Sequence, residues 1–239
     1  FNPIRVDVSF IGLENYKKIL TDEYFTKSVF NTFFFMLSIP FSMFFGLLLA
    51  VFLNKGFRGN KLVRVIYYLP VVSSIVAVNI VWRYIFNGEN GILNHMLGTS
   101  IQWLGNSDWP IRFAVIIKSV WGSIGVVMIL YLAGLQNIPK SLYEAADIDG
   151  ANAFQKFRII TVPLLSPVTF YVLITSMIGT LQSFADSQIL AAGNPAARTI
   201  VYYIWSKGID QGRYGMASAA SLILAVTIMI ITIIQFKNS

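Results

Sequence analysis

Long apolar stretches without a single charged residue dominate the hydrophobic pattern of this chain. Charges are absent between Lys27 and Lys55, between Arg158 and Asp186, and between Arg213 and Lys237. Two shorter uncharged stretches cover residues 65–82 and 119–139. A helix needs about 20 mostly apolar residues to cross a bilayer. The pattern therefore predicts five membrane spans, near residues 28–53, 65–86, 112–135, 163–185 and 214–236.

The apolar runs are continuous, whereas the strands of a membrane barrel alternate apolar and polar positions. Isolated spans of this kind are helical because a helix satisfies its own backbone hydrogen bonds in lipid. Four prolines, at 40, 70, 163 and 167, lie in or at the edges of spans, where neighbouring helices tolerate them. We therefore expect an all-α, polytopic membrane protein built as a helical transmembrane bundle.

The connecting segments differ in charge, which predicts their sidedness. Residues 54–64 hold four Lys and Arg residues and no acid, whereas residues 87–110 hold two acids and no Lys or Arg. Basic loops favour the cytoplasmic side. Alternation then places 136–162 in the cytoplasm and 186–213 outside, although the latter segment carries Arg198, Lys207 and Arg213. Residues 1–27 are predicted to form an amphipathic segment on the outer side, before a permease domain spanning 28–239.

Composition narrows the possible chemistry. Of the 239 residues, 56% are hydrophobic and only 12% are charged, against about 25% in a soluble domain. There is no cysteine and one histidine, His95, which has no partner at metal-ligand spacing, so no metal site is expected. The net charge of +7 fits the basic cytoplasmic loops of a membrane protein and does not indicate nucleic-acid binding.

Residues 138–162 carry the most informative motif, in a predicted cytoplasmic loop. Pro139, Ser141 and Glu144 fit a helix start with a Ser-x-x-Glu capping box. Gly150 interrupts the pattern, and residues 151–158 can form a second short helix with Phe154 and Phe157 on one side. The sequence predicts a compact projection made of two short helices that meet at a glycine.

The same segment resembles the EAA motif of ABC importer permeases, in its carbohydrate-uptake variant. The matching positions are Glu144, Ala145, Ala146, Asp149, Gly150, Ala151, Phe157, Ile160, Pro163, Leu164, Leu165 and Pro167; Val162 replaces a common leucine. Further matches include Leu69-Pro70, Trp82-Arg83 and residues 133–136, so the resemblance covers nearly the whole chain. It is closest to the first permease of maltose and glycerol-3-phosphate systems.

The resemblance implies the fold of type I importer permeases, with one more helix before Phe1. It implies that residues 138–162 form a coupling helix that docks on a cytoplasmic ATPase through Glu144, Ala145, Ala146, Asp149, Gly150, Ala151, Phe154 and Phe157. It also implies two ATPase subunits, a second and different permease chain, an extracytoplasmic sugar-binding protein and a location in the bacterial inner membrane. From the residues alone, a role of Glu144 in the capping box is the favoured interpretation, and the resemblance favours docking; the two roles are compatible.

An ATPase has to be a separate chain. The sequence contains no GxxxxGK[ST] motif, and none of its 17 glycines is followed by lysine. We therefore expect a non-catalytic subunit that binds no cofactor itself, with ATP and Mg²⁺ bound by partner ATPases.

Polar residues within the spans are candidates for the substrate pathway, because unpaired polar groups in a membrane usually face the bundle interior. The candidates are Asn79, Ser119, Trp121, Gln182, Ser183 and Asp186, with Ser73, Ser74 and Ser123 beside them. Gln182 and Asp186 rank first because they lie four residues apart on one helical face. Serines can instead bond their own helix backbone, and Asp186 could simply end a helix in water.

Lys118 lies within a predicted span and has three possible roles: it can snorkel outward, pair with an acid on the partner permease, or line the pathway.

An ion-coupled secondary transporter or channel is the alternative function. That class needs intramembrane acids or broken helices for its coupling ions, and these spans hold almost no acid. An intramembrane enzyme lacks paired carboxylates and a usable thiol or imidazole. A purely structural membrane subunit is the third alternative.

Overall fold

The computed structural model describes residues 11–105 and 107–237, which form helices joined by short loops and no β-strand. The α-helices are α1 (Glu14–Leu20), α2 (Glu23–Phe35), α3 (Ser38–Asn54), α4 (Asn60–Val72), α5 (Ile75–Ile85), α6 (Ile92–Leu97), α7 (Asp108–Gln136), α8 (Lys140–Ile148), α9 (Ala153–Lys156), α10 (Val162–Leu164), α11 (Ser166–Leu181), α12 (Ile200–Trp205) and α13 (Tyr214–Lys237). Three π-helical turns, η1 (Phe157–Thr161), η2 (Asp186–Leu190) and η4 (Ser206–Asp210), and one 3₁₀ turn, η3 (Pro195–Ala197), complete the set.

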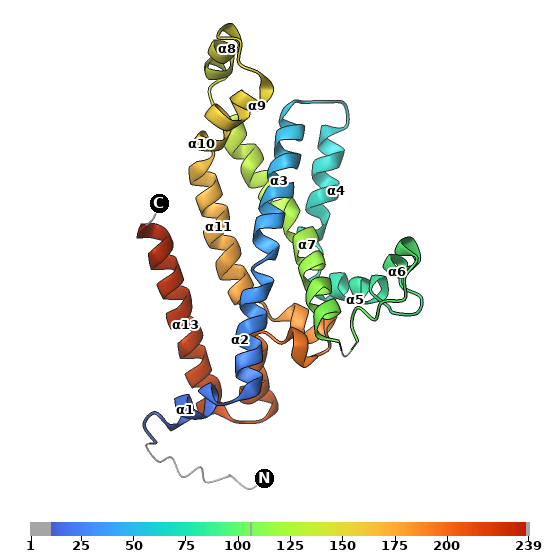
Figure 1. Ribbon diagram of the computed structural model, residues 1–239, viewed down its shortest axis with the longest axis vertical. Helices are drawn as coiled ribbons and strands as arrows, with labels where there is room; N and C mark the ends of the chain where they lie inside the picture. The colour runs from blue at the N-terminus through green and yellow to red at the C-terminus, as the bar shows by residue number, and fades with distance from the viewer. Residues whose placement is uncertain (1–10, 106, 238–239) are drawn as a thin grey trace.

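Three helical segments are long and apolar enough to cross a membrane: 23–54, 108–136 and 214–237. Two bent helix pairs raise the number of candidate spans in the described chain to five. These five occupy the same parts of the chain as the five uncharged stretches. The first and third extend several residues beyond the predicted limits, and all of the long helices run roughly along the molecule (Figure 1).

The span predicted near 65–86 consists of two helices and not of one straight helix. Helices α4 and α5 meet at an angle of 102°, with the break at Ser73 and Ser74. Pro70 removes one backbone donor from the last turn of α4. The Ser73 hydroxyl then donates to the Leu69 carbonyl, and the extended backbone of Ser73 ends the helix. Local polar groups therefore complete the turn that the proline weakens.

The fourth predicted span is also bent. The segment 153–164 meets α11 at 62° around Leu165, and α11 ends at Leu181 instead of residue 185. Pro163 and Pro167 flank this bend, where each lacks the N–H of a regular helix.

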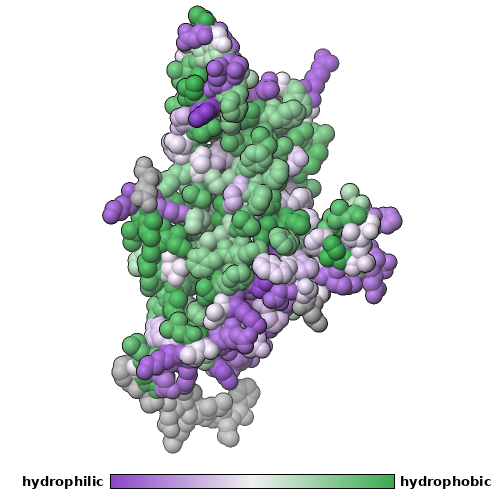
Figure 2. All heavy atoms as spheres, in the orientation of Figure 1, coloured by the Kyte–Doolittle hydropathy of each residue, from purple (hydrophilic) through white to green (hydrophobic). Residues whose placement is uncertain are grey.

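The two ends of the molecule gather different segments. The turn between α3 and α4 lies at the same end as α8 and α9, whereas α1, α5 and α6 lie toward the opposite end (Figure 1). Apolar side chains cover the flanks of the long helices, and polar ones collect toward the ends (Figure 2). The basic loop 54–64 and the segment 136–162 therefore share one end, as alternation of the spans requires. Part of the expected amphipathic segment, residues 1–10, lies outside the described residues.

Two of the basic residues that the charge rule places awkwardly outside are engaged within the fold. Lys207 Nζ lies 2.9 Å from Asp22 Oδ2, which also accepts from the Tyr203 hydroxyl at 2.9 Å. Arg198 Nε donates to the Gly193 carbonyl at 2.7 Å. Both cations bind groups of their own chain. The number of basic residues in 186–213 is therefore a weak guide to which side of the membrane this segment faces.

Helix α7 forms the centre of the packing and contacts α3 along much of its length. Close approach depends on glycines that face neighbouring helices. A Cβ on Gly46 would lie 2.6 Å from Val127 Cγ1, and a Cβ on Gly125 would lie 2.1 Å from the Tyr67 carbonyl oxygen. These contacts fix α3, α4 and α7 as one wall around the interior of the bundle.

Candidate functional site

The first candidate site is the projection formed by residues 140–156, which comprises α8 and α9. Gly150 follows α8 with φ of +75°, a left-handed conformation that favours glycine. The Ala151 N–H donates to the Ala146 carbonyl and the Gly150 N–H to the Asp147 carbonyl. This pair of bonds is a Schellman motif, which ends α8 and reverses the chain. The two-helix projection with a glycine turn has the predicted form.

The predicted capping box is wrong in position. Pro139 is the N-cap of α8, and no side chain caps that helix, so Ser141 and Glu144 form no box. A capping box occurs instead at α9, where Asn152 and Gln155 bond each other's backbone N–H groups. Both motifs fit the same pattern, but in the structure Ser141 lies one residue inside α8. Glu144 is thereby released from the local role that the sequence also allowed.

Two contacts hold the projection together and attach it to the bundle. Lys156 Nζ pairs with an Asp147 carboxylate oxygen and so ties α9 to α8. The Tyr143 hydroxyl lies 2.9 Å from the Thr161 hydroxyl on η1, which continues into the bent span. The projection is therefore attached to the segment that leads into the bent span.

The surface of the projection is largely exposed. Among the predicted docking residues Glu144, Ala145, Asp149, Gly150 and Phe154 are exposed, and Ala146, Ala151 and Phe157 are half-buried. Ile148 is 88% exposed and Phe154 is 70% exposed. No hydrogen bond or ion pair within the described chain engages the Glu144 side chain. The tip of the projection therefore exposes large apolar side chains around an unpaired acid. Such a surface is typical of an interaction site.

Ile148 is not among the predicted docking residues, although it is the most exposed large apolar side chain of α8.

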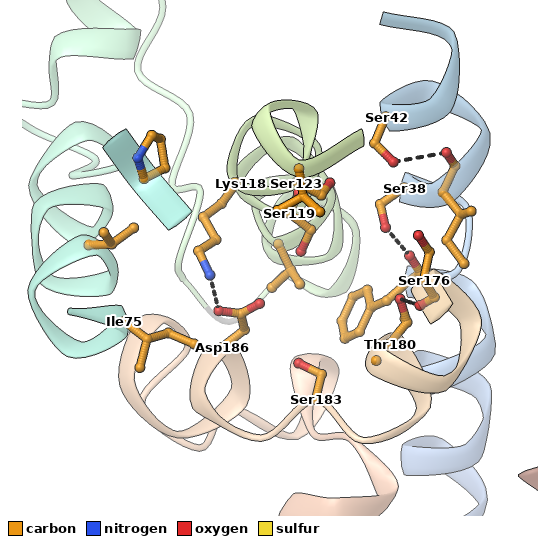
Figure 3. Close-up of a pocket in the computed structure, with 18 of the residues that line it drawn as sticks. Ser38, Ser42, Ile75, Lys118, Ser119, Ser123, Ser176, Thr180, Ser183 and Asp186 are labelled. Atoms are coloured by element: carbon orange, nitrogen blue, oxygen red, sulfur yellow. Dashed lines mark hydrogen bonds and ion pairs between the residues drawn. The ribbon is translucent and has the colours of Figure 1, made fainter. Parts of the chain in front are cut away.

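The second candidate site is a cavity of about 410 Å³ in the bundle, lined by both apolar and polar side chains. It is lined by Phe35, Ser38, Ile39, Ser42, Pro70, Val71, Ser73, Ile75, Val78, Val115, Lys118, Ser119, Gly122, Ser123, Val126, Ser176, Gly179, Thr180, Ser183 and Asp186. Most of the labelled polar side chains surround one open region between α3, α7, α11 and η2 (Figure 3). The break between α4 and α5 lies in the cavity wall.

Lys118 on α7 donates a hydrogen bond to Asp186 Oδ1 on η2, and both side chains are nearly buried (Figure 3). Of the three roles considered for Lys118, snorkelling is wrong because the ammonium group points to Asp186 inside the bundle. Its acid partner is in its own chain, and Lys118 lines the cavity. Asp186 does not simply end a helix in water.

The cavity gathers only part of the predicted pathway set. Ser119, Ser183 and Asp186 line it. Asn79 is fully buried outside the lining, and neither polar atom of its side chain has a hydrogen-bond partner in the described chain. Trp121 is exposed and packs edge-on against Trp82.

Gln182 and Asp186 do not share one helical face. Helix α11 ends at Leu181, Gln182 is its exposed C-cap, and Asp186 begins a separate π-helical turn. The argument from four-residue spacing fails because the regular helix stops between the two residues.

Four polar cavity residues were not predicted: Ser38, Ser42, Ser176 and Thr180. The sequence did contain a usable signal. Ser or Thr residues occur four apart at 38 and 42, at 119 and 123, and at 176 and 180, and a spacing of four places both members on one helix face. Within the described residues no group of three or more His, Asp or Glu side chains could hold a metal ion.

The chain matches known transport proteins over most of its length. The family described as "Binding-protein-dependent transport system inner membrane component" matches residues 42–237. The arabinooligosaccharides transport system permease protein AraP of Halalkalibacterium halodurans is 37% identical over 96% of this chain and 75% of that protein. The trehalose/maltose transport system permease protein MalF of Thermococcus litoralis is 36% identical over 95% of this chain and 79% of that protein.

Solved structures support the same assignment. A chain from the crystal structure of a bacterial ABC transporter involved in import of the acidic polysaccharide alginate superposes with a TM-score of 0.87. The two sequences are 27% identical, and the superposition covers 97% of this chain and 84% of the other chain. The helical membrane fold predicted from the uncharged stretches is thus confirmed. The chain belongs to the binding-protein-dependent transport system inner membrane components, the permease family that the sequence at 144–167 resembles.

Proposed function

We propose that this chain is a transmembrane permease subunit of an ATP-driven importer for a carbohydrate, such as an oligosaccharide or a related sugar. Its relatives include permeases named for arabinooligosaccharide, trehalose/maltose and sn-glycerol-3-phosphate transport, and similar solved chains belong to an alginate importer. The cavity in the bundle lies on the translocation pathway. The setting is the inner membrane of a bacterium or the equivalent plasma membrane.

The working assembly contains a second, related permease, two cytoplasmic ATPases and an extracytoplasmic sugar-binding protein. One similar solved structure is described as a complex with an alginate-bound periplasmic protein. ATP and Mg²⁺ are bound by the ATPases, and this chain carries no catalytic residue. ATP-driven closure of the ATPases shifts the paired permeases between inward-open and outward-open states.

The observation that carries the proposal is the exposed projection 140–156. It ends in unpartnered apolar side chains around Glu144, and the contact between Tyr143 and Thr161 ties it to the bent span. We propose that Glu144, Ala145, Ala146, Asp149, Gly150, Ala151, Phe154 and Phe157, joined by Ile148, dock into a groove of the ATPase. Glu144 pairs there with a basic residue, an interaction whose loss costs about 2–5 kcal/mol when the charges are desolvated.

Glu144→Lys tests this coupling. We expect the variant to insert into the membrane normally and to lose ATP-driven uptake, because a lysine opposes the basic partner. Glu89→Lys makes the same charge change on an exposed residue of the loop between α5 and α6 and is expected to keep uptake. Both variants are measured by uptake of labelled sugar and by co-purification of the ATPase. Normal uptake in Glu144→Lys would remove Glu144 from the coupling role.

The energy source separates this function from an ion-coupled transporter. Uptake by the assembled importer is expected to continue after the proton gradient is collapsed and to stop when ATP is depleted. Uptake that stops when the proton gradient is collapsed but continues without ATP would favour the ion-coupled alternative. In that case the projection would have no ATPase to bind.

A further inference from the structure

We propose that the Lys118–Asp186 pair makes the cavity selective for uncharged polyhydroxyl ligands and excludes acidic ones. This inference rests on the proposed function, because it assumes that the cavity lies on the sugar pathway. It adds the charge class of the substrate, which the relatives do not settle: some are named for neutral sugars, and a similar solved chain belongs to an importer of an acidic polysaccharide.

The first support is the charge of the cavity wall. Lys118 and Asp186 are the charged members of the lining, and their side chains are only 9% and 12% exposed. Their contact joins α7 to η2 across 68 residues of sequence. Each charge is offset by the other, so the wall has no net charge and no unpaired cation to receive a carboxylate.

The second support is the hydrogen-bonding character of the lining. Five hydroxyls donate to backbone carbonyls three or four residues earlier in the chain and leave lone pairs that can accept hydrogen bonds from a ligand: Ser38, Ser42, Ser73, Ser123 and Thr180. Within the described chain no hydrogen bond engages the side-chain hydroxyls of Ser119, Ser176 or Ser183, which are free to donate and to accept.

Asp186 adds a further acceptor. Lys118 binds Oδ1, and no hydrogen bond in the described chain engages Oδ2. A sugar hydroxyl can both donate and accept, so it fits a wall rich in acceptors. A uronate carboxylate only accepts, so it can use only the donors of the wall, which are the free hydroxyls and the remaining N–H groups of Lys118, and its negative charge meets no unpaired cation. Taking a carboxylate out of water costs free energy, and a wall without net charge does not repay that cost.

Cysteine chemistry can measure the charge that a ligand meets, because the 239 residues contain no cysteine. Ser119→Cys places a thiol beside the pair, and the assembled importer in nanodiscs is treated with hydroxyethyl and sulfonatoethyl methanethiosulfonate. The measured quantity is the ratio of the anionic to the neutral modification rate at this thiol, relative to the same ratio for a free thiol in solution. The assembly without Ser119→Cys is the control for other reactive groups.

We expect Asp186→Asn to raise this ratio by about tenfold and Lys118→Gln to lower it by about tenfold, since each leaves one nearby charge unbalanced. The double variant Lys118→Gln/Asp186→Asn buries no unpaired charge, so it guards against misfolding and is expected to return the parent ratio. A ratio that stays constant across these variants would overturn the inference.

Ligand protection tests the sugar itself. Maltotriose and arabinotriose serve as neutral probes and trigalacturonate as the acidic probe. We expect a neutral probe to slow labelling of Ser119→Cys by the hydroxyethyl reagent, and trigalacturonate to do so only with Asp186→Asn. Protection of the parent cavity by trigalacturonate, or by neither neutral probe, would contradict the proposal. If the importer transports carbohydrate but the charge changes leave the reagent ratios and the protection unchanged, only this inference fails. If the importer transports no carbohydrate, the proposed function fails, and the reagent ratios still report the charge of the cavity.

Discussion

Gly150 determines the shape of the projection through its backbone conformation alone. Its φ is +75°, and a Cβ at this position would meet no atom within 4 Å. A substitution therefore causes backbone strain without a steric clash. A residue with a Cβ in the left-handed region costs about 1–2 kcal/mol, and asparagine is the side chain that tolerates it best.

Gly150→Ala is therefore expected to loosen the turn between α8 and α9. A cost of about 1 kcal/mol raises the fraction of opened turn about fivefold. Hydrogen exchange at the amides of residues 150 and 151 measures this change directly, because both donate to α8 carbonyls. Gly150→Asn is the matched control and should exchange at an intermediate rate. Unchanged exchange in Gly150→Ala would mean that the turn does not need a left-handed residue.

Asp22, at the end of the molecule opposite the projection, makes the stability of the fold depend on pH. Burial raises the pKa of Asp22, but hydrogen bonds from Lys207, Tyr203 and the Tyr24 N–H outweigh burial and hold the pKa below its ordinary 3.8. A carboxylate with a lowered pKa in the folded state stabilises the fold above its unfolded pKa, and this stabilisation is lost as the pH falls through the folded value.

Asp22→Asn should consequently lower the unfolding temperature at pH 7, and the difference from the parent chain should be smaller at pH 3. Thermal unfolding of the purified protein in detergent at both pH values measures this. Glu14→Gln is the control, since Glu14 pairs with Lys18 at an exposed surface, where ion pairs contribute little. An equal effect of Asp22→Asn at both pH values would show that the carboxylate charge is not what stabilises this end.

At the scale of elements, the positions of the spans could be predicted because lipid excludes charge and leaves long uncharged stretches. The breaks could not be placed in the same way. Pro70 lies in the second span, but the 102° turn also needs the extended backbone of Ser73, which composition does not reveal. Gln182 and Asp186 were misjudged because nothing in their spacing shows that α11 ends at Leu181.

The sites divide along the same line. The projection 140–156 is local in sequence, so its two helices and its glycine turn could be predicted from a single segment. The cavity joins residues from α3, α7, α11 and η2, and the Lys118–Asp186 contact spans 68 residues. No rule of sequence spacing pairs side chains that far apart, so only the structure identifies Asp186 as the partner of Lys118.

Helix α7 offers a direct test of how tightly the bundle is packed. A Cβ on Gly125 would lie 2.1 Å from the Tyr67 carbonyl oxygen, which is backbone and cannot swing away. Gly125→Ala is expected to separate α4 from α7 and to destabilise the protein by about 1–3 kcal/mol. Gly122→Ala is the matched control one turn earlier, where a Cβ meets nothing within 4 Å. Thermal unfolding of both variants measures the difference, and equal stability would contradict this packing.

At the scale of the whole molecule, two segments with different roles share one end. The basic loop 54–64 and the projection 140–156 lie together, and α6 lies toward the other end (Figure 1). The charge of 54–64 predicts that the shared end is cytoplasmic. This assignment puts the projection where a cytoplasmic partner can reach it.

Single cysteines can test this orientation against the cysteine-free background. Gln155→Cys on α9 and Met96→Cys on α6 both replace exposed side chains. An impermeant maleimide should label Met96→Cys in intact cells and Gln155→Cys only in inside-out vesicles. Labelling of both positions from the same side would refute the predicted topology.

The joint between α4 and α5 has a mechanical consequence. Residues of both helices line the cavity, and at Ser73 and Ser74 the two segments are already separate rods. Tilting one rod while the other stays fixed therefore breaks no helical hydrogen bond and requires only rotation about a few backbone dihedrals. A change in the width of the cavity at this joint would therefore rearrange side-chain contacts but would not require either helix to unwind.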